Sequence, residues 1–494
     1  MSCDNEIPAS IELSAAGIRQ LSDPKEVVSL SMPSSIAATQ AQNTTGYIPG
    51  LLGTVCQFIY NAAPHPNKDI ALSGAIALLA GVAGKAYNTY TGAGLNQYIL
   101  LLASTAMGKE AAASGISKLL LSVTAYVPAA GGFKGPALVS SAGLIKWLDK
   151  APSIVSIIGE FGYRLKAISS HKANPNDEML KATLLDVYGK SGAGNVLDPL
   201  AYSDREKQTS QIISPSVTLL GESVPSIVYE ALNDSMILSG LLPRFMLIEA
   251  CGPRSQLNEN PVTFPDHALV QALADLCGQC LSLNHNNTVH VVEADAEAKA
   301  KFREFGQWVT DQINGHSSEI QRELWNRAHL KALKLATLCA VGINHLAPII
   351  TIDEALWATG LIVAQTNALS AKFANGEVGE VAGDEVKQQR AIMRAITEYA
   401  GDSYDRWQSY HGTEAMHRDG VVTLPHIMQR LRGTAAFKND RLGATKAIER
   451  TIKLLLDGDQ LREVPGTQMQ VKYGSKPRSY VISDPASFLA SLTN

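Results

Sequence analysis

The segment ASTAMGKE, residues 103–110, carries the residue types of a phosphate-binding loop. In such a loop, backbone N–H groups and the start of a helix hold phosphate oxygens, and a lysine adds positive charge for the β and γ phosphates. Gly108 and Lys109 match these roles, although Ala103 replaces the usual first glycine and Glu110 the usual hydroxyl residue. An ordinary strand-to-helix turn is the alternative. The predicted ATP-binding residues are Ser104, Thr105, Ala106, Met107, Gly108, Lys109 and Glu110.

A candidate catalytic acid ends the apolar segment SIVSIIGE. Glu160 is the predicted base, because a carboxylate beside the γ-phosphate orients or deprotonates the attacking water. The preceding position usually holds an aspartate that serves magnesium, but here it is Gly159. The alternative for Glu160 is an acid at a strand end that faces solvent.

Two further segments place polar residues next to apolar runs. SVTLLGES ends in Glu222 and Ser223, where we expect a sensor of the γ-phosphate. SGLLPRFMLIE places Arg244 directly before an apolar run. An arginine there can reach a nucleotide held by a neighbouring subunit and stabilise charge that develops during phosphoryl transfer. A surface arginine or a structural ion pair is the alternative for Arg244.

These side chains need a sheet to bring them together, and the sequence predicts one. Strand-like apolar runs alternate with helical segments, a pattern typical of an α/β fold with a parallel sheet covered by helices. The predicted strands are residues 97–102, 137–140, 153–158, 216–220 and 245–249, and the helices between them include residues 109–126, 141–150 and 178–188. Later helices are predicted at residues 295–313, 317–344 and 352–373, with one strand-like run at 288–293.

A chain of 494 residues is long enough for roughly three domains. The predicted regions are a flexible leader (1–46), an N-terminal helical region (47–92), a P-loop NTPase core (93–260), an α-helical region (261–375), a linker (376–385) and a winged-helix DNA-binding domain (386–494).

Composition and charge narrow the class of protein. The hydrophobic share of 46% and the charged share of 18% are typical of a globular chain. The net charge of −4 excludes a protein coated in basic charge, so any contact with nucleic acid is confined to a local patch. Six scattered cysteines and an N-terminus without a secretory pattern predict a cytoplasmic location. The apolar run 70–84 is too short to span a bilayer, so we expect a buried helix and no membrane contact.

The C-terminal region contains the basic patch. Between Val421 and Tyr480 there are 11 basic and five acidic residues, a local charge of +6. Helices at 386–400, 424–431 and 441–456, followed by strands at 461–464 and 479–482 around a hairpin loop, match a winged-helix pattern. The predicted DNA-binding residues are Lys446, Arg450 and Lys453 on the third helix and Lys472, Lys476 and Arg478 in the wing. A winged helix used for protein contact is the alternative.

Two other patterns have ordinary structural explanations. Cys277, Cys280, His285 and His290 have spacing similar to a zinc knuckle, but two of them fall on a predicted helix, so buried thiols and loop histidines are favoured and no metal site is predicted. Arg327, Lys331 and Lys334 form a positive stripe at helical spacing, for which a solvated face is favoured over a contact with nucleotide.

Taken together, the segments resemble a family of phage, plasmid and prophage P-loop ATPases that are often joined to primase or replication modules. The resemblance rests on NQYILLLASTAMGKEAA, SIIGEFG, SPSVTLLGESVPSIVYEAL, SGLLPRF and ELWNRAHLKALKLATLCA, and covers roughly residues 50–373. It implies a RecA/AAA-like or helicase-like core that binds ATP and Mg²⁺ and assembles into a homo-oligomeric ring or hexamer. Lys109, Glu160 and Arg244 take the corresponding family positions, whereas Ala103, Glu110 and Gly159 depart from the general pattern.

The leading hypothesis is therefore a DNA-dependent ATPase, a helicase-like motor in the replication of a phage or mobile element. DNA and a primase or another replication protein are the expected partners. The alternative is an oligomeric scaffold, loader or DNA-binding regulator that binds nucleotide with little or no turnover. A protein-interaction adaptor that uses neither site is the third possibility.

Overall fold

The computed structural model describes residues 48–170, 173–199, 210–232, 234–316, 318–374, 378, 384–401, 403–406, 412–438 and 440–483. Its described residues divide into two compact units, one within residues 48–378 and the other within 384–483. The predicted leader, residues 1–46, lies outside the described residues, as does most of the predicted linker, residues 376–385. The division between the units falls at residues 379 and 380, inside that linker.

The larger unit is built around a four-stranded sheet in which every pair of neighbours is parallel. Its strands are β2 (Tyr98–Leu102), β3 (Ser153–Ile158), β6 (Ser216–Ser223) and β7 (Phe245–Glu249), in the order β3-β6-β2-β7. Nearly all of their residues are buried, which is why these strands read as continuous apolar runs. A mixed α/β fold with parallel strands is therefore confirmed.

The predicted strand at residues 137–140 is wrong. The chain does approach the outer edge of β3, because the N–H of Gly135 donates to the carbonyl of Val155 at 2.9 Å. Pro136 follows and has no N–H to continue such a ladder, so the segment runs on without strand pairing to α6 (Ser141–Leu148).

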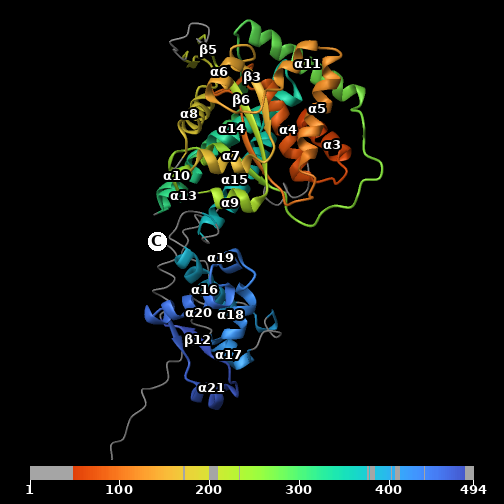
Figure 1. Ribbon diagram of the computed structural model, residues 1–494. Coiled ribbons are helices and arrows are strands. Elements are labelled where there is room, and N and C mark those ends of the chain that lie inside the picture. The colour runs from red at the N-terminus through yellow and green to blue at the C-terminus, as the bar shows by residue number, and fades with distance from the viewer. Residues whose placement is uncertain are drawn as a thin grey trace, which may run out of the picture. The chain divides into compact units, whose positions relative to one another are not determined.

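Helices cover both faces of this sheet, as Figure 1 shows. Alternate residues along each strand point to opposite faces, so the sheet separates two apolar cores. One core includes α3 (Gly50–Ala62), α4 (Lys68–Ala83), α5 (Glu110–Thr124), α11 (His267–His285) and α14 (Ala328–Ile343). The other includes α6, α7 (Phe161–Ile168), α8 (Pro175–Gly189), α9 (Pro225–Ala231) and α10 (Asp234–Leu238).

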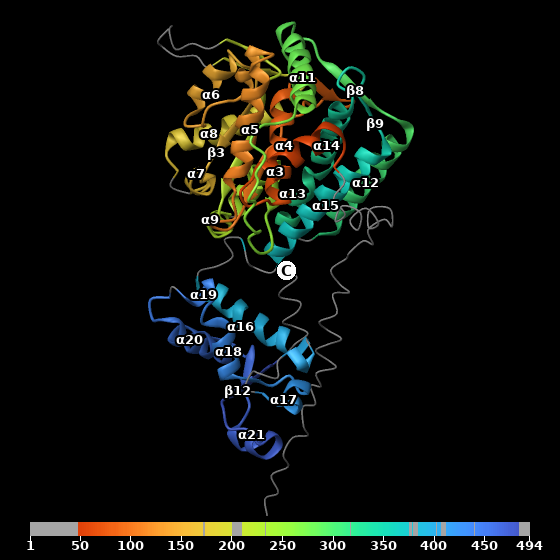
Figure 2. The ribbon, with the colours of Figure 1, turned by 90° about the vertical axis from the view of Figure 1, so that its right-hand side faces the viewer.

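A second parallel sheet joins segments that lie far apart in the sequence. It consists of β1 (Tyr87–Thr89), β8 (His290–Ala294) and β9 (Ile349–Ile350), in the order β1-β8-β9, and Figure 2 shows β8 and β9 close to α12 (Ala296–Gly315). The predicted helix 317–344 is two helices, α13 (Glu319–Asn326) and α14, because Arg327 leaves the helical conformation. With α15 (Ile352–Ala374), these elements share one core with the N-terminal helices, so the regions 47–92, 93–260 and 261–375 form one compact unit.

Short elements complete the larger unit. They are the 3-10 helices η1 (Pro128–Phe133) and η3 (Leu242–Arg244) and the antiparallel pair β4 (Val196–Leu197) and β5 (Ile212–Ile213). The predicted buried helix at residues 70–84 corresponds to α4, which is almost entirely enclosed. Among the described helices, none has the length and apolarity to span a bilayer.

The smaller unit packs three helices against a short antiparallel sheet. The helices are α16 (Asp384–Gly401), α18 (Leu424–Leu431) and α20 (Ala444–Asp457), and the strands are β10 (Val422–Thr423), β11 (Leu461–Glu463) and β12 (Ser479–Ile482), in the order β10-β12-β11. The predicted pairing of β11 with β12 is confirmed. Further short helices are η4 (Tyr404–Arg406), α17 (Glu414–Arg418) and α19 (Ala435–Lys438).

The predicted hairpin loop between β11 and β12 is wrong. The connection contains α21 (Gly466–Tyr473), which ends where Gly474 adopts φ 61°. A glycine in this left-handed conformation is a common end of a helix, so Gly474 terminates α21 and does not form a hairpin turn. Lys472 consequently lies on a helix.

Candidate functional site

The phosphate-binding loop predicted from the sequence forms a tight turn between β2 and α5. Ala106 and Gly108 have positive φ angles of 69° and 79°, and the N–H of Met107 donates to the carbonyl of Ser104 at 3.2 Å. No described group accepts a hydrogen bond from the N–H of Ala106, Gly108 or Lys109. The loop therefore presents unused donors at the start of a 15-residue helix, an arrangement that suits an anion.

Ala103, which stands where the phosphate-binding pattern has its first glycine, does not strain the backbone. Ala103 is fully buried at the end of β2, and it is not among the residues with positive φ, so glycine is not required there. Its N–H donates to the carbonyl of Ser223 at 3.0 Å, which ties the loop to the neighbouring strand β6.

Lys109 and Glu160 form an ion pair. Their Nζ and Oε1 atoms are 2.5 Å apart, and 13% of the lysine side chain and 54% of the glutamate side chain are exposed. Glu160 follows β3 and precedes α7 with φ 51°, a strained conformation for a residue with a side chain. A carboxylate and a lysine from two strand ends therefore meet at one point on the carboxyl edge of the sheet.

Glu222 and Ser223 lie on the same edge, because Leu101 pairs with Glu222 and Leu102 with Ser223 in the parallel register. Glu222 is only 4% exposed, and its Oε1 has no hydrogen-bond partner. Burial, together with the negative charges of Glu110 and Glu160, raises the pKa of Glu222 to about 7, against the opposing effect of Lys109. This carboxyl group is therefore protonated in a large share of molecules near neutral pH.

A cavity of about 320 Å³ opens beside the loop. Its wall comes from the loop, from the first turns of α5, from the connection between α3 and α4, and from the segment that follows β7. The residues are Ala62, Pro64, His65, Ala106, Gly108, Glu110, Ala111, Ser114, Gly115 and Arg254. The volume lies in the range of small-molecule sites.

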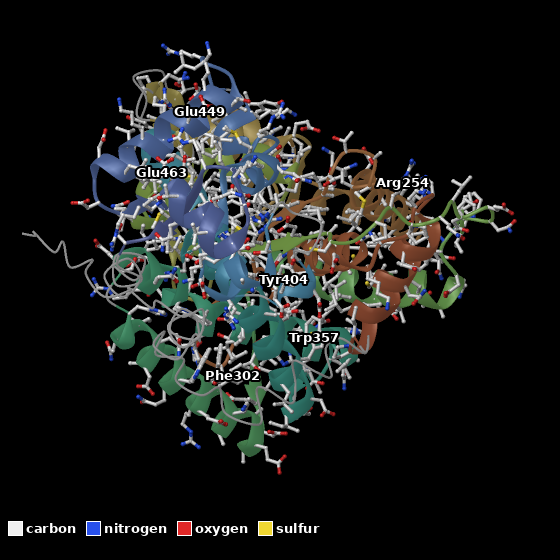
Figure 3. The ribbon with its side chains drawn as sticks, turned by 90° about the horizontal axis from the view of Figure 1, so that it is seen from below. Arg254, Phe302, Trp357, Tyr404, Glu449 and Glu463 are labelled. Atoms are coloured by element: carbon white, nitrogen blue, oxygen red, sulfur yellow. The ribbon has the colours of Figure 1, made fainter. Side chains whose placement is uncertain are left out.

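His65 and Arg254 are functional candidates that the sequence patterns did not suggest. Arg254 donates from Nη2 to Nε2 of His65 at 2.5 Å, and His65 contacts the carbonyl of Ser255 through Nδ1 at 3.0 Å. Figure 3 shows Arg254 beside the helices of the N-terminal region. The two residues are far apart in the chain and belong to no known spacing pattern, so only the fold brings them to one wall.

Arg244 lies at the opposite edge of the sheet from Lys109. It directly precedes β7, and Tyr98 pairs with Phe245, so Arg244 is at the amino ends of β2 and β7. Its Nη1 donates to the carbonyl of Gly240 at 2.5 Å. Gly240 has φ 74°, and a Cβ atom there would lie 2.6 Å from this guanidinium, so glycine allows Arg244 to fold over the turn.

Three more cations lie at this amino edge, and the predicted solvated face for two of them is wrong. Lys331 and Lys334 are 6% and 1% exposed. Lys331 donates to the carbonyl of Phe245 at 3.1 Å, and Lys334 donates to Oδ1 of Asn96 at 2.6 Å. Helical periodicity predicted an exposed face for these lysines. Because α14 is enclosed on nearly every side, its polar positions are also buried in the core.

The electrostatics of the amino edge reflect this burial. Desolvation lowers the pKa of Lys331 to about 8 and, with Arg327 and Arg244, that of Lys334 to about 7. The ammonium of Lys334 lies 4.3 Å from the ring centre of Tyr188, and the guanidinium of Arg244 lies 5.8 Å from it. Arg327 has no hydrogen-bond or ion-pair partner among the described side chains.

The predicted DNA-binding residues of the smaller unit fall into two groups. Arg450 pairs with Asp440 at 3.0 Å, Lys472 with Asp419 at 3.1 Å, and Arg478 with Glu463 at 2.8 Å. Lys446 and Lys453 on α20 and Lys476 before β12 are exposed and form no ion pair within the described part of the chain. Only the second group is available to phosphates without breaking a contact inside the unit.

The cysteine–histidine pattern does not converge on a metal in the described residues. Cys277 and Cys280 lie on the buried face of α11, where desolvation raises the pKa of both thiols, and the ring of His290 packs against Tyr87. No group of three or more His, Cys, Asp or Glu residues with metal-binding geometry occurs in the described ranges.

Comparisons with known proteins return no matching family model and no matching curated protein.

Proposed function

We propose that the larger unit binds and hydrolyses ATP at the carboxyl edge of its sheet, and that the smaller unit binds DNA. The protein would then act as a helicase-like motor in the replication of a phage or mobile element. The observation that carries this proposal is the meeting of Lys109, Glu160 and Glu222, from three different strand ends, beside the loop with unused N–H groups.

The strand order supports a ligand at this place. The chain leaves β2 and passes over the position of β6 to form β3, whereas β7 lies on the other side of β2. Ligands of open α/β sheets bind outside the carboxyl ends of the strands, at the point where the strand order changes direction. The loop after β2 occupies that point.

The side chains suit phosphoryl transfer. Lys109 would place its charge on the β and γ phosphates, and Glu160, once released from Lys109, would orient and deprotonate the attacking water. Protonated Glu222 can donate a hydrogen bond to a phosphate oxygen, because its unpartnered Oε1 is buried at the same edge. Magnesium is usually held by one or two carboxylates together with phosphate oxygens, and Glu110 is the carboxylate in position for that role.

Arg244 would act on the nucleotide of a second copy. The strand β7 has five residues, so at about 3.3 Å per residue its two ends are roughly 15 Å apart, too far for Arg244 to reach Lys109 in its own chain. A head-to-tail contact brings the amino edge of one copy to the carboxyl edge of the next, and repeated contacts of this kind form a ring when the rotation between copies closes. The proposed oligomer is therefore a ring.

The exposed lysines on α20 and before β12 support the proposed DNA contact. Lys446, Lys453 and Lys476 can neutralise backbone phosphates, which favours affinity over the reading of base sequence. Two features favour the alternative of a scaffold or loader with little turnover: the base Glu160 is held by Lys109, and Gly159 supplies no carboxylate for magnesium.

The test is ATP binding and ATP hydrolysis by the full chain, with and without single- and double-stranded DNA. Lys109→Ala should abolish binding, while Glu160→Gln should keep binding and lower turnover by about 100-fold or more. Lys150→Ala, at an exposed lysine, is the control. ATP binding with no turnover under any DNA condition would establish the scaffold alternative, and ATP binding that survives Lys109→Ala would refute the site.

A further inference from the structure

The cavity beside the loop continues along α5, away from Lys109. It shares Ala106, Gly108 and Glu110 with the phosphate-binding loop, and it extends to Ser114 and Gly115 one turn further along the helix. We propose that this cavity receives the nucleoside half of ATP and that Arg254 is the residue that recognises it. The inference rests on the proposed function and assigns the part of the ligand that the phosphate residues do not touch.

The chemistry of the wall suits an aromatic base. Ala62, Pro64 and Ala111 are small and apolar, so this part of the wall has no polar side chain that a base would have to desolvate. The polar groups of the wall are the carboxylate of Glu110, the hydroxyl of Ser114, the imidazole of His65 and the guanidinium of Arg254, and the last two are hydrogen-bonded to each other. A mostly apolar pocket with a small number of polar groups is the usual form of a cofactor site.

The segment from Cys251 to Thr263, which we call the strap, builds the outer wall. It leaves β7, runs along the outer side of α3 and reaches α11, and Figure 1 shows it as the long green loop at that side of the unit. The N–H of Asn258 donates to the carbonyl of Pro64 at 2.8 Å, and the N–H of Val262 donates to that of Asn61 at 3.0 Å. The strap is therefore fastened to the connection between α3 and α4.

The side chain of Asn258 strengthens this attachment. Its Nδ2 donates to the carbonyls of Asn61 and Ala63, two acceptors at the end of α3 that have no partner further along that helix. Because the strap carries Arg254 and the same connection carries His65, the attachment holds both residues at the mouth of the cavity. The wall is therefore held by contacts within the protein.

The contacts of His65 leave Arg254 as the residue that faces the ligand. Arg254 is a donor only, so Nε2 of His65 accepts its hydrogen bond, and Nδ1 carries the proton that goes to the carbonyl of Ser255. Both ring nitrogens are then engaged. The remaining N–H groups of the exposed Arg254 can donate to ring nitrogens or ribose oxygens of a nucleoside, or its plane can stack on the base.

The experiment compares ATP with inorganic triphosphate, which has the phosphates without the nucleoside. Dissociation constants are measured by calorimetry on the full chain with magnesium present. The wild-type protein should bind ATP at least about tenfold more tightly than triphosphate, since tenfold corresponds to one or two good contacts. Ser114→Phe should fill the cavity and weaken ATP binding about tenfold while leaving triphosphate binding unchanged.

Two more variants complete the design. Arg254→Ala should also weaken ATP binding alone, and its exposed position keeps the fold intact if Ser114→Phe proves unstable. Leu121→Phe adds the same aromatic group to α5 at a side chain that is 75% exposed and outside the cavity, and it should change neither affinity.

The outcomes separate the inference from the function on which it rests. Equal binding of ATP and triphosphate, both lost in Lys109→Ala, would overturn the nucleoside pocket and leave the phosphate site standing. Loss of both ligands in Ser114→Phe but not in Leu121→Phe would also overturn it, because the cavity would then serve the phosphates. If neither ligand binds the wild-type protein, the ATP site and the pocket both fail.

Discussion

The two edges of the four-stranded sheet carry opposite charge. At the carboxyl edge, Glu110, Glu160 and Glu222 lie near Lys109, and Glu249 at the end of β7 pairs with Lys372. At the amino edge, burial and the positive charges of Arg327 and Arg244 lower the pKa of Lys334, and burial and the charge of Arg327 lower the pKa of Arg244, which the carboxylate of Asp186 raises. Lys331 lies at the same edge, where burial lowers its pKa. Edges of opposite sign at the ends of the same strands favour a head-to-tail contact between copies.

The edges also differ in access. The carboxyl edge opens into a cavity of about 320 Å³, and Glu160 is more than half exposed there. The space beside Lys331 is about 10 Å³, enough for one water at most. The two lysines of the amino edge are therefore buried, whereas Arg244 and Arg327 are partly exposed. In the proposed scheme, the carboxyl edge is the binding site, and the amino edge holds Arg244 in position.

The largest expected effect concerns Arg244. Arg244→Ala should lower ATP turnover about 1,000-fold with little change in ATP affinity, because an arginine that stabilises the transferring phosphate acts in the transition state. Turnover and equilibrium binding are measured on the same preparation. Arg322→Ala, at an exposed arginine on α13, is the control.

Mixing decides whether Arg244 acts between copies. Lys109→Ala and Arg244→Ala are each inactive in this scheme, but a mixed ring contains interfaces where an intact Lys109 meets an intact Arg244. Mixing the two variants should therefore restore part of the turnover. No recovery in a mixture that assembles would show that the two edges do not meet.

The next largest effect is expected on the free energy of unfolding, from Lys334→Met. Its pKa of about 7 lies below the ordinary 10.5, so the unfolded chain binds more protons than the folded chain between these values. The contribution of Lys334 to the free energy of unfolding is fully present above pH 10.5 and is lost as the pH falls through 7. Relative to Lys334→Met, the wild-type free energy of unfolding should rise by roughly 2 to 3 kcal/mol from pH 7 to pH 9.

Chemical denaturation across this pH range measures that difference. Lys150→Met, at an exposed lysine, should leave the pH dependence unchanged. A constant difference between Lys334→Met and the wild type at every pH would show that Lys334 is not a buried cation in the folded protein.

Glu222→Gln should have the smallest effect on the free energy of unfolding, with a pH dependence opposite in sign to that of Lys334. Its pKa of about 7 lies above the ordinary 4.5, so the folded chain binds more protons between these values. The contribution of Glu222 to the free energy of unfolding is fully present below pH 4.5 and is lost as the pH rises through 7. Relative to Glu222→Gln, the wild-type free energy of unfolding should fall by about 2 kcal/mol between pH 5 and pH 7.

The exposed Glu178→Gln on α8 is the control for this measurement. If the wild type and Glu222→Gln respond to pH in the same way, the carboxyl group is solvated and the carboxyl edge lacks its neutral acid.

The sequence by itself determined the elements that bury a continuous apolar face. The strands at residues 153–158 and 245–249 have the predicted bounds, and Glu160, Glu222 and Ser223 follow from parallel strands that end at one edge. Such elements are readable because each strand is buried on both faces, so its whole length is apolar. A wrong prediction of a single element has a local cause: the segment 137–140 does not pair as a strand because Pro136 precedes it.

Only the tertiary structure decided which charged groups are buried and which distant residues meet. The sequence predicts Lys334 to be a surface residue, but the packing around α14 buries it. Glu222 is an ordinary acid in the sequence, but burial raises its pKa in the folded protein. His65 and Arg254 share a wall only because the strap crosses the end of α3. Burial and long-range contact depend on the packing of the whole chain, and no local spacing of residue types encodes them.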